Sequence, residues 1–199
     1  MTKTELLSFI SKYSLGNNVE SVSWELKDNS ITTKFVSSDK TLKGIVTMNN
    51  AEINTSLPEI GIYTTSQLVR MLSILDDDIE VSVTNTSMQV NDKYTDFSFV
   101  LADLDVIPKS PKLKMTPSFT STIKITDDFT NKFVKSHGAL PENDFFTVES
   151  DIISKQVTFG YSDTNANRIS FNIDVEGEDI QPMHFSSGLM REILVANKG

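Results

Sequence analysis

The chain has 199 residues, of which 38% are hydrophobic, and a formal net charge of −9. This length allows one large domain or two of ordinary size, and two is our expectation. The absence of cysteine excludes a disulfide framework and a thiolate metal site. No apolar run approaches the roughly 18 residues of a membrane span, and a secretion signal is lacking, so we expect a soluble intracellular protein without a membrane partner. The acidic total disfavours a uniformly basic nucleic-acid-binding surface but permits a segregated basic face.

The first predicted elements are a helix and a set of strands. Apolar residues recur at helical spacing over residues 3–13, and glycine and asparagine follow. Alternating apolar and polar residues then predict a hairpin with strands at 22–26 and 31–35. Two further strands are predicted at 42–48 and 51–55.

Residues 61–101 repeat this order of one helix and several strands. Thr65 is the expected N-cap of a helix that extends to Leu75, because apolar residues recur at i, i+3, i+4 and i+7 from Leu68. The aspartates at 76–78 point in different directions and have no histidine beside them, so we interpret them as the end of the helix rather than as a metal site. Strands are then predicted at residues 79–83, 88–90 and 94–101.

A proline-containing segment interrupts the pattern. Three prolines fall between Asp105 and Pro117, where they would disrupt a sheet and favour extended backbone. We therefore predict an interdomain connector over residues 104–117, between an N-terminal domain of residues 1–103 and a C-terminal domain of residues 118–199.

The C-terminal half follows the same order. A strand is predicted at 119–125, and Thr126 is the expected N-cap of a helix that ends near Gly138. Ser186 is expected to open a fourth helix. After that helix the repeat predicts two or three more strands, so the second domain is expected to be incomplete at its C-terminus. The strands predicted between the two helices cover residues 145–149, 157–161 and 168–173.

The four predicted helices recur about every sixty residues. The expected buried positions are Leu6, Leu68, Phe129 and Leu189, followed one turn later by Ile10, Leu72, Phe133 and Ile193. This spacing predicts an α+β protein of two similar domains, each with two helices packed on antiparallel sheets. The alternative is an accidental regularity in an ordinary α+β protein.

Positive charge is concentrated in the helical segments. They contain seven basic and four acidic residues, a net charge of +3, so the remaining residues must carry −12 to give the total of −9. We predict that these basic residues bind duplex DNA through its phosphates, independently of sequence. For each residue alone, a solvated charge on a helix surface is an equally good interpretation. The candidate DNA-binding residues are Lys3, Lys12, Arg70, Lys132, Lys135, Arg191 and Lys198.

The segment EIGIYTTSQLVRMLSILDDDIEVSV, residues 59–83, resembles the DNA polymerase sliding clamps, and among them the trimeric clamps of T-even-like bacteriophages. The repeat order and the connector extend the resemblance more loosely to the rest of the chain. It implies a DNA-clamp fold in a homotrimeric ring, with helices lining a channel for duplex DNA. It also implies subunits joined by edge strands, with residues 94–101 of one beside residues 168–173 of the next.

The resemblance further implies a function and partners. A clamp tethers the replicative DNA polymerase and so makes synthesis processive. Its expected partners are the polymerase, a clamp loader ATPase and transcription factors of late genes, in the cytoplasm of an infected bacterial host. In clamps the connector borders an apolar pocket for the peptide tails of such partners. The alternative is that its apolar residues only pack the connector against the sheets. The candidate residues for binding these peptide tails are Leu104, Val106, Ile107, Leu113 and Met115.

No motif of an enzyme is present. The sequence lacks GxGxxG, GxxxxGK and GxSxG, and His137 and His184 lie far apart without a nucleophile at recognisable spacing. We therefore predict no catalytic residues, no metal and no cofactor. The competing function is a non-enzymatic, β-rich, ring-forming structural protein of a virion, which would not need positive charge on its helices. We interpret the strand aromatics as sheet core rather than as base-stacking platforms. They are Trp24, Phe35, Phe97, Phe99, Phe145, Phe159 and Phe171.

Overall fold

The computed structural model describes residues 1–111, 118–160 and 166–198. Its contacts divide the chain into two compact units, unit 1 (Met1–Lys112) and unit 2 (Leu113–Gly199). Each described unit combines two α-helices with antiparallel sheets, which confirms the predicted α+β class. The predicted domain boundaries, with domains of residues 1–103 and 118–199 and a connector at 104–117, remain a prediction.

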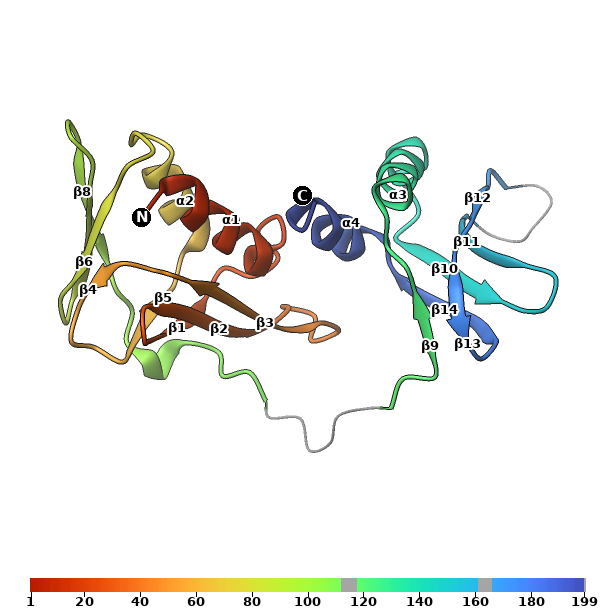
Figure 1. Ribbon diagram of the computed structural model, residues 1–199, viewed down its shortest axis with the longest axis horizontal. Helices are drawn as coiled ribbons and strands as arrows, with labels where there is room; N and C mark the ends of the chain where they lie inside the picture. The colour runs from red at the N-terminus through yellow and green to blue at the C-terminus, as the bar shows by residue number, and fades with distance from the viewer. Residues whose placement is uncertain (112–117, 161–165, 199) are drawn as a thin grey trace. The chain divides into compact units, whose positions relative to one another are not determined.

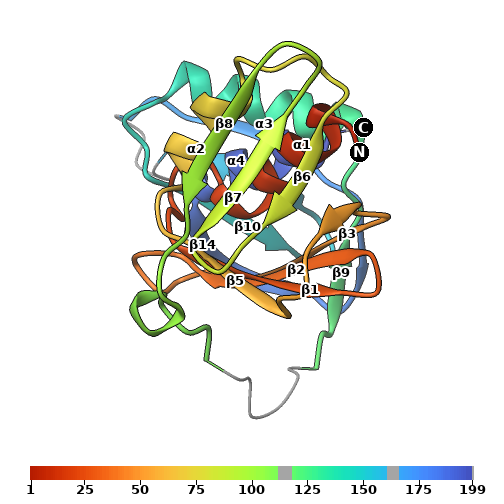
Figure 2. The ribbon, with the colours of Figure 1, turned by 90° about the vertical axis from the view of Figure 1, so that its left-hand side faces the viewer.

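In residues 1–111, unit 1 forms two four-stranded sheets and two α-helices (Figure 1). One sheet has the strand order β3-β2-β1-β5 with antiparallel neighbours. The other has the order β4-β6-β7-β8, in which β4 pairs parallel with β6. Strands β6, β7 and β8 lie side by side, with α1 and α2 behind them in Figure 2. The elements are α1 Lys3–Ser14, β1 Val22–Lys27, β2 Ser30–Val36, β3 Lys43–Asn49, β4 Ile53–Asn54, β5 Glu59–Ile62, α2 Thr65–Leu72, β6 Glu80–Val83, β7 Ser87–Asn91, β8 Asp96–Val100 and the short 3₁₀ helix η1 Leu104–Val106.

The core of unit 1 is built around three aromatic side chains. Phe9 and Tyr13 of α1 meet Trp24 of β1 edge to face, with ring centroids 5.5 and 6.5 Å from that of Trp24. The Tyr13 hydroxyl lies 3.3 Å from the Thr65 hydroxyl, which joins the end of α1 to the start of α2. Burial raises the pKa of Tyr13, so the phenol stays protonated.

The two helices of unit 1 begin differently. Thr2 and Glu5 form a capping box at α1, in which each side chain accepts a hydrogen bond from the other residue's backbone N–H. The prediction of Thr65 as the N-cap of α2 is wrong. Thr64 is the N-cap, without a side-chain bond, while the Thr65 hydroxyl donates to the Glu20 carbonyl at 2.9 Å. The Glu20 carboxylate accepts from the Ser66 N–H instead, so a residue far away in sequence caps this helix.

Helix α2 is shorter than predicted. It ends at Leu72 rather than Leu75, because the N–H groups of Ile74 and Leu75 bond to carbonyls three residues back and tighten the last turn. Leu75 is still buried. The aspartates that follow therefore do not end the helix.

In residues 118–160 and 166–198, unit 2 forms one four-stranded sheet of order β12-β11-β10-β14, a two-stranded sheet β13-β9 and two helices. The predicted helices and most strands are present, but the sequence interpretation missed β13 and β14. The elements are β9 Ser121–Ile123, α3 Asp127–Ala139, β10 Phe145–Ser150, β11 Lys155–Phe159, β12 Ile169–Asn172, β13 Val175–Gly177, β14 Ile180–Ser186 and α4 Ser187–Ala196.

Phe133 of α3 is the centre of the unit 2 core. Its ring centroid lies 4.8 Å from that of Phe146 and 4.9 Å from that of Phe159. The prediction that Phe145 belongs to the core is wrong, because this side chain is 61% exposed and Phe146 takes the inward position. Of the other predicted strand aromatics, Phe97 and Phe171 are half-buried. Trp24, Phe35, Phe99 and Phe159 are buried as predicted.

The fourth helix is offset by one residue from its predicted alignment. Thr65 and Ser187 occupy similar places, since each donates its backbone N–H and its hydroxyl to carbonyls just before the partner strand, which is β1 for β5 and β10 for β14. Leu194 therefore takes the buried position that Leu72 has in α2. The expected core residues Leu189 and Ile193 are only half-buried. The chain has two residues between β5 and α2 but none between β14 and α4.

Candidate nucleic-acid interface

Two basic residues of unit 1 extend from its helices without an acidic partner. Arg70 lies on the side of α2 opposite the buried Leu68 and Leu72, and it is exposed. Lys12 lies in the last turn of α1, where a positive charge also interacts favourably with the helix dipole. Within residues 1–111, neither side chain forms an ion pair.

Lys3, the third candidate of unit 1, is engaged within the fold. Its ammonium group donates to the Leu75 carbonyl, and its backbone N–H donates to the Asp77 carbonyl at 2.7 Å. The pKa of Asp77 is lowered, chiefly by hydrogen bonds from Thr4. The pKa of Asp92 is lowered too, chiefly by backbone N–H groups, and Lys3 contributes to both shifts. Lys3 therefore has no ion pair within residues 1–111, but a backbone carbonyl binds its ammonium group and two carboxylates lie close enough to feel its charge.

The candidates on α3 differ in their pairing. Lys132 forms an ion pair with Asp128 one turn earlier, at 2.7 Å. Lys135 is exposed on the side of α3 opposite Phe133 and has no ion pair within the described part of unit 2. Of these two, Lys135 offers the larger uncompensated charge.

The candidates near α4 are weaker. Arg191 pairs with the neighbouring Glu192, which largely cancels its charge. Because α4 is offset by one residue, Glu192 stands where α2 has Arg70. Lys198 donates to the Asn131 side chain at 3.0 Å; this partner is neutral and leaves the positive charge uncompensated.

The structure therefore separates the seven candidates into two groups. Lys12, Arg70, Lys135 and Lys198 keep an uncompensated charge within the described residues. Lys132 and Arg191 form ion pairs with acidic residues, and the Lys3 ammonium group is bound to the Leu75 carbonyl. The i,i+4 spacing of Asp128 and Lys132 could have indicated their ion pair, whereas the contact of Lys3 with Leu75 joins residues far apart in sequence.

The connector is attached to the sheet β3-β2-β1-β5 up to residue 111. The Ala102 N–H donates to the Gly61 carbonyl at 3.0 Å, and Ile107 is buried against Gly61, where a Cβ would lie 2.5 Å from the Ala102 carbonyl oxygen. Further on, the Ser110 hydroxyl bonds to the Phe35 carbonyl, and Lys43 bonds to the Pro111 carbonyl. The connector thus passes from β5 to β2 and β3.

Of the predicted peptide-binding residues, Val106 is 59% exposed, Leu104 is half-buried and Ile107 is buried. Leu113 and Met115 lie outside the described residues. Sequence reasoning missed Ile45, which is 63% exposed and points to the same side of β3 as Lys43, the residue that holds the connector. The alternation of β3 could have identified it.

Two strands named in the sequence analysis lie at sheet edges. β8 ends the order β4-β6-β7-β8, and β12 ends the order β12-β11-β10-β14. Among the residues described, neither has a second pairing partner. Such edges expose backbone N–H and C=O groups that another strand can bind.

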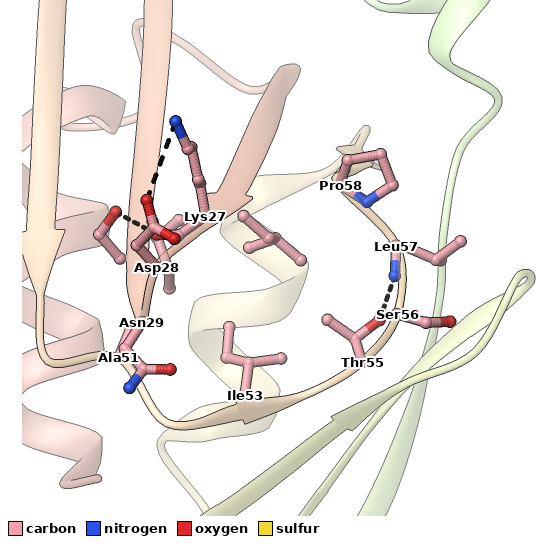
Figure 3. A pocket seen from close by; sticks show the side chains of 12 residues that line it. Lys27, Asp28, Asn29, Ala51, Ile53, Thr55, Ser56, Leu57 and Pro58 are labelled. Atoms are coloured by element: carbon pink, nitrogen blue, oxygen red, sulfur yellow. Dashed lines mark hydrogen bonds and ion pairs between the residues drawn. The ribbon is translucent and has the colours of Figure 1, made fainter.

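A pocket of about 370 Å³ lies beside the hairpin turn of β1 and β2 (Figure 3). Asp28 and Asn29 take left-handed backbone conformations in this turn, as hairpins of two-residue loops require. Lys27 pairs with Asp28 at 3.8 Å, and Thr55 accepts the Leu57 N–H at 3.1 Å on the opposite wall. The wall includes no histidine and none of the predicted site residues.

The described ranges offer little other chemistry. They contain no cluster of three or more metal-ligating side chains, and none of their helices is long and apolar enough to cross a membrane. His184 bonds to the Thr147 hydroxyl at 2.9 Å, on the exposed side of β10.

The fold is similar to that of solved PCNA structures. Over 98% of this chain and 81% of the other, it matches A. fulgidus PCNA bound to the C-terminal region of FEN-1, with a TM-score of 0.74 and 15% identity. Over 100% of this chain and 84% of the other, it matches a structure of the PCNA2–PCNA3 complex from Sulfolobus tokodaii, with a TM-score of 0.71 and 11% identity. No family model matches the sequence, and no curated protein matches it. The chain has the DNA-clamp fold, as predicted.

Proposed function

We propose that this protein is a sliding clamp, a non-enzymatic ring that encircles duplex DNA and tethers a replicative DNA polymerase for processive synthesis. The observation that carries the proposal is the clamp fold of the whole described chain combined with uncompensated positive charge on its helices. In an acidic protein, helices that carry a net positive charge attract phosphates, while the remaining surface, which is net negative, repels DNA.

Within the clamps, we place the protein with those of T-even-like bacteriophages, which implies a homotrimer in the cytoplasm of an infected bacterium. The segment from Glu59 to Val83 supports this placement by its resemblance to that type. The subunits join through β8 of one and β12 of the next, since both strands end their sheets. The expected binding partners, besides the polymerase, are a clamp loader ATPase and transcription factors of late genes.

The first part of the connector provides the partner-binding surface of the proposed clamp. Val106 and Ile45 are exposed apolar side chains, and hydrogen bonds from Ser110 and Lys43 fix the connector beside β2 and β3. A preformed apolar surface suits a short peptide tail, because little of the protein has to be ordered on binding. Replacing Val106 by serine should weaken the binding of polymerase tails.

The function is tested with a polymerase and its loader on a primed single-stranded circle. We expect long products with the unmodified protein and short products with a variant that carries Lys12→Ala, Arg70→Ala and Lys135→Ala. Exposed helix positions tolerate alanine well, so this variant should stay folded.

A matched variant replaces three exposed lysines outside the helices. Lys27, Lys93 and Lys124 serve this purpose, and their loss changes the net charge by the same amount. Long products from this control and short ones from the helix variant support the proposal. Equal product lengths from both variants, or no stimulation by the unmodified protein, contradict it and favour a structural ring protein.

A further inference from the structure

The hairpin turn between β10 and β11 presents two isoleucines to solvent. Ile152 and Ile153 are each 95% exposed. They are the central residues of a turn that the Asp151 N–H closes by donating to the Ser154 carbonyl at 2.7 Å. Glycine, proline and short polar residues are the usual occupants of such positions, and the turn between β1 and β2 follows that rule. The geometry of the turn therefore does not account for the two isoleucines.

The same turn is held in place by its aspartate. The Asp151 Oδ1 atom accepts the backbone N–H groups of Ser154 at 2.5 Å and Ile153 at 2.7 Å. These two bonds lower the pKa of Asp151, so its carboxylate stays charged. We call residues 151–154 the isoleucine tip. It is a preformed apolar projection with one negative charge at its base, and little of it has to be ordered on binding.

The pocket drawn in Figure 3, here called the hairpin pocket, has the size and the apolar lining that would receive such a tip. Ile31 and Ala51 are buried in its wall, and Ile53 and Leu57 are half-buried there. In Figure 3 the Ile53 side chain points into the middle of the hollow. The volume of about 370 Å³ equals the space of roughly twelve liquid water molecules, so two four-carbon side chains fit.

The rim of the hairpin pocket complements the charge of the isoleucine tip. Lys27 and Asn29 are exposed hydrogen-bond donors on this rim. The ion pair of Lys27 with Asp28 is 3.8 Å long, and the two side chains are 84% and 86% exposed. Such a pair contributes little, so the ammonium group remains able to bind another carboxylate. Asp151, at the base of the tip, supplies one.

We infer that the isoleucine tip of one copy of this chain inserts into the hairpin pocket of a second copy. Ile152 and Ile153 cover Ile53, and Asp151 lies beside Lys27. The contact is heterologous, because the tip belongs to unit 2 and the pocket to unit 1. It buries less than about 1,200 Å², so the association is weak and reversible. The inference does not rest on the proposed function, since neither DNA nor a polymerase takes part.

The test compares two variants of the full chain, alone and mixed. The tip variant carries Ile152→Ser and Ile153→Ser, and the pocket variant carries Ile53→Asp. Sedimentation velocity at concentrations up to about 1 mM gives the average mass of each sample, because a contact of this size is weak. We expect the mass of the unmodified chain to rise with concentration. Each variant alone should need at least about tenfold more protein for the same rise, since apolar contacts are lost.

The mixture is the sharpest sample. The tip variant keeps an intact pocket and the pocket variant keeps an intact tip, so the mixture should be heavier than either variant at the same total concentration. A second pocket variant, Lys27→Glu, changes only an exposed side chain and should weaken association about two- to fivefold. The control Ile74→Ser should change nothing, because Ile74 is 72% exposed beyond the end of α2, outside tip and pocket.

Three outcomes overturn the inference. In the first, the mass of the unmodified chain does not change with concentration. In the second, the tip variant associates as strongly as the unmodified chain. In the third, the mixture is no heavier than its separate components, which would mean that the tip binds elsewhere. Joining of subunits through β8 and β12 would persist in every variant, so its presence or absence affects none of these comparisons.

Discussion

The salt dependence of DNA binding should distinguish the uncompensated helix cations from the paired ones. The perturbation is the triple change Lys12→Ala, Arg70→Ala and Lys135→Ala, compared with the double change Lys132→Ala and Arg191→Ala. The first removes charges that have no acidic partner in the described structure. The second removes charges that Asp128 and Glu192 already balance.

The expected magnitude follows from counterion release. Each phosphate contact contributes about 0.9 to the slope of log affinity against log salt concentration on B-DNA. Losing three contacts lowers the slope by about 2.7 for each subunit that touches the duplex. When salt rises from about 50 to about 200 mM, the unmodified protein and the triple variant both lose affinity for DNA. The factor by which affinity falls should be about 40-fold smaller for the triple variant.

The assay is fluorescence anisotropy of a labelled duplex, titrated with protein at several salt concentrations. The double variant should keep most of the slope, because ion pairs within the protein leave less charge for the phosphates. An unchanged slope in the triple variant, with a folded circular dichroism spectrum, would refute the assignment of these helices to the DNA-facing surface.

Three further predictions concern stability and the connector. Among the described residues, five carboxyls have a lowered pKa, so they favour the folded state when deprotonated; their contribution to stability should be fully present above pH of about 4 and be lost as the pH falls further, as circular dichroism during acid titration would show. Four of these groups lie in unit 1, so its tryptophan fluorescence should change before unit 2 unfolds, and simultaneous unfolding would contradict this. Gly61→Ala should cost about 1 to 3 kcal/mol and weaken binding of partner tails, because the new Cβ collides with the Ala102 carbonyl; unchanged thermal stability would count against it. Phe133→Ala should destabilise unit 2 by about 4 kcal/mol, measured by urea unfolding, whereas the same change at the exposed Phe145 should have little effect. The carboxyls are Glu5, Asp39, Asp77, Asp92 and Asp151.

Most helices and strands could be predicted because their periodicity is local. The apolar spacing in α1 and the alternation in β1 and β2 both arise from burial of one face, and the sequence shows it directly. β14 was missed for a physical reason. Pro182 argues against a strand, and the apolar residues of β14 remain exposed. An edge strand tolerates proline because one side needs no donor.

The candidate site was harder to predict than the fold. The partners of Lys3 and the cap of α2 lie many residues away, so no local pattern contains them. The one-residue offset of α4 shows in the hydrogen bond of Ser187 to Asn143, far away in sequence, and it moves Arg191 away from the position that Arg70 occupies in α2. Sequence composition located the positive charge on the helices, while only side-chain contacts show which charges remain uncompensated.

The most direct test of the clamp proposal compares retention on circular and linear DNA. The protein is loaded by a clamp loader onto a nicked plasmid, the complex is isolated by gel filtration, and one sample is then cut once with a restriction enzyme. We predict that the protein stays with the intact circle and leaves the linearised DNA through its ends. Equal retention on both forms, or no retention on the circle, would contradict the proposal that this protein encircles DNA.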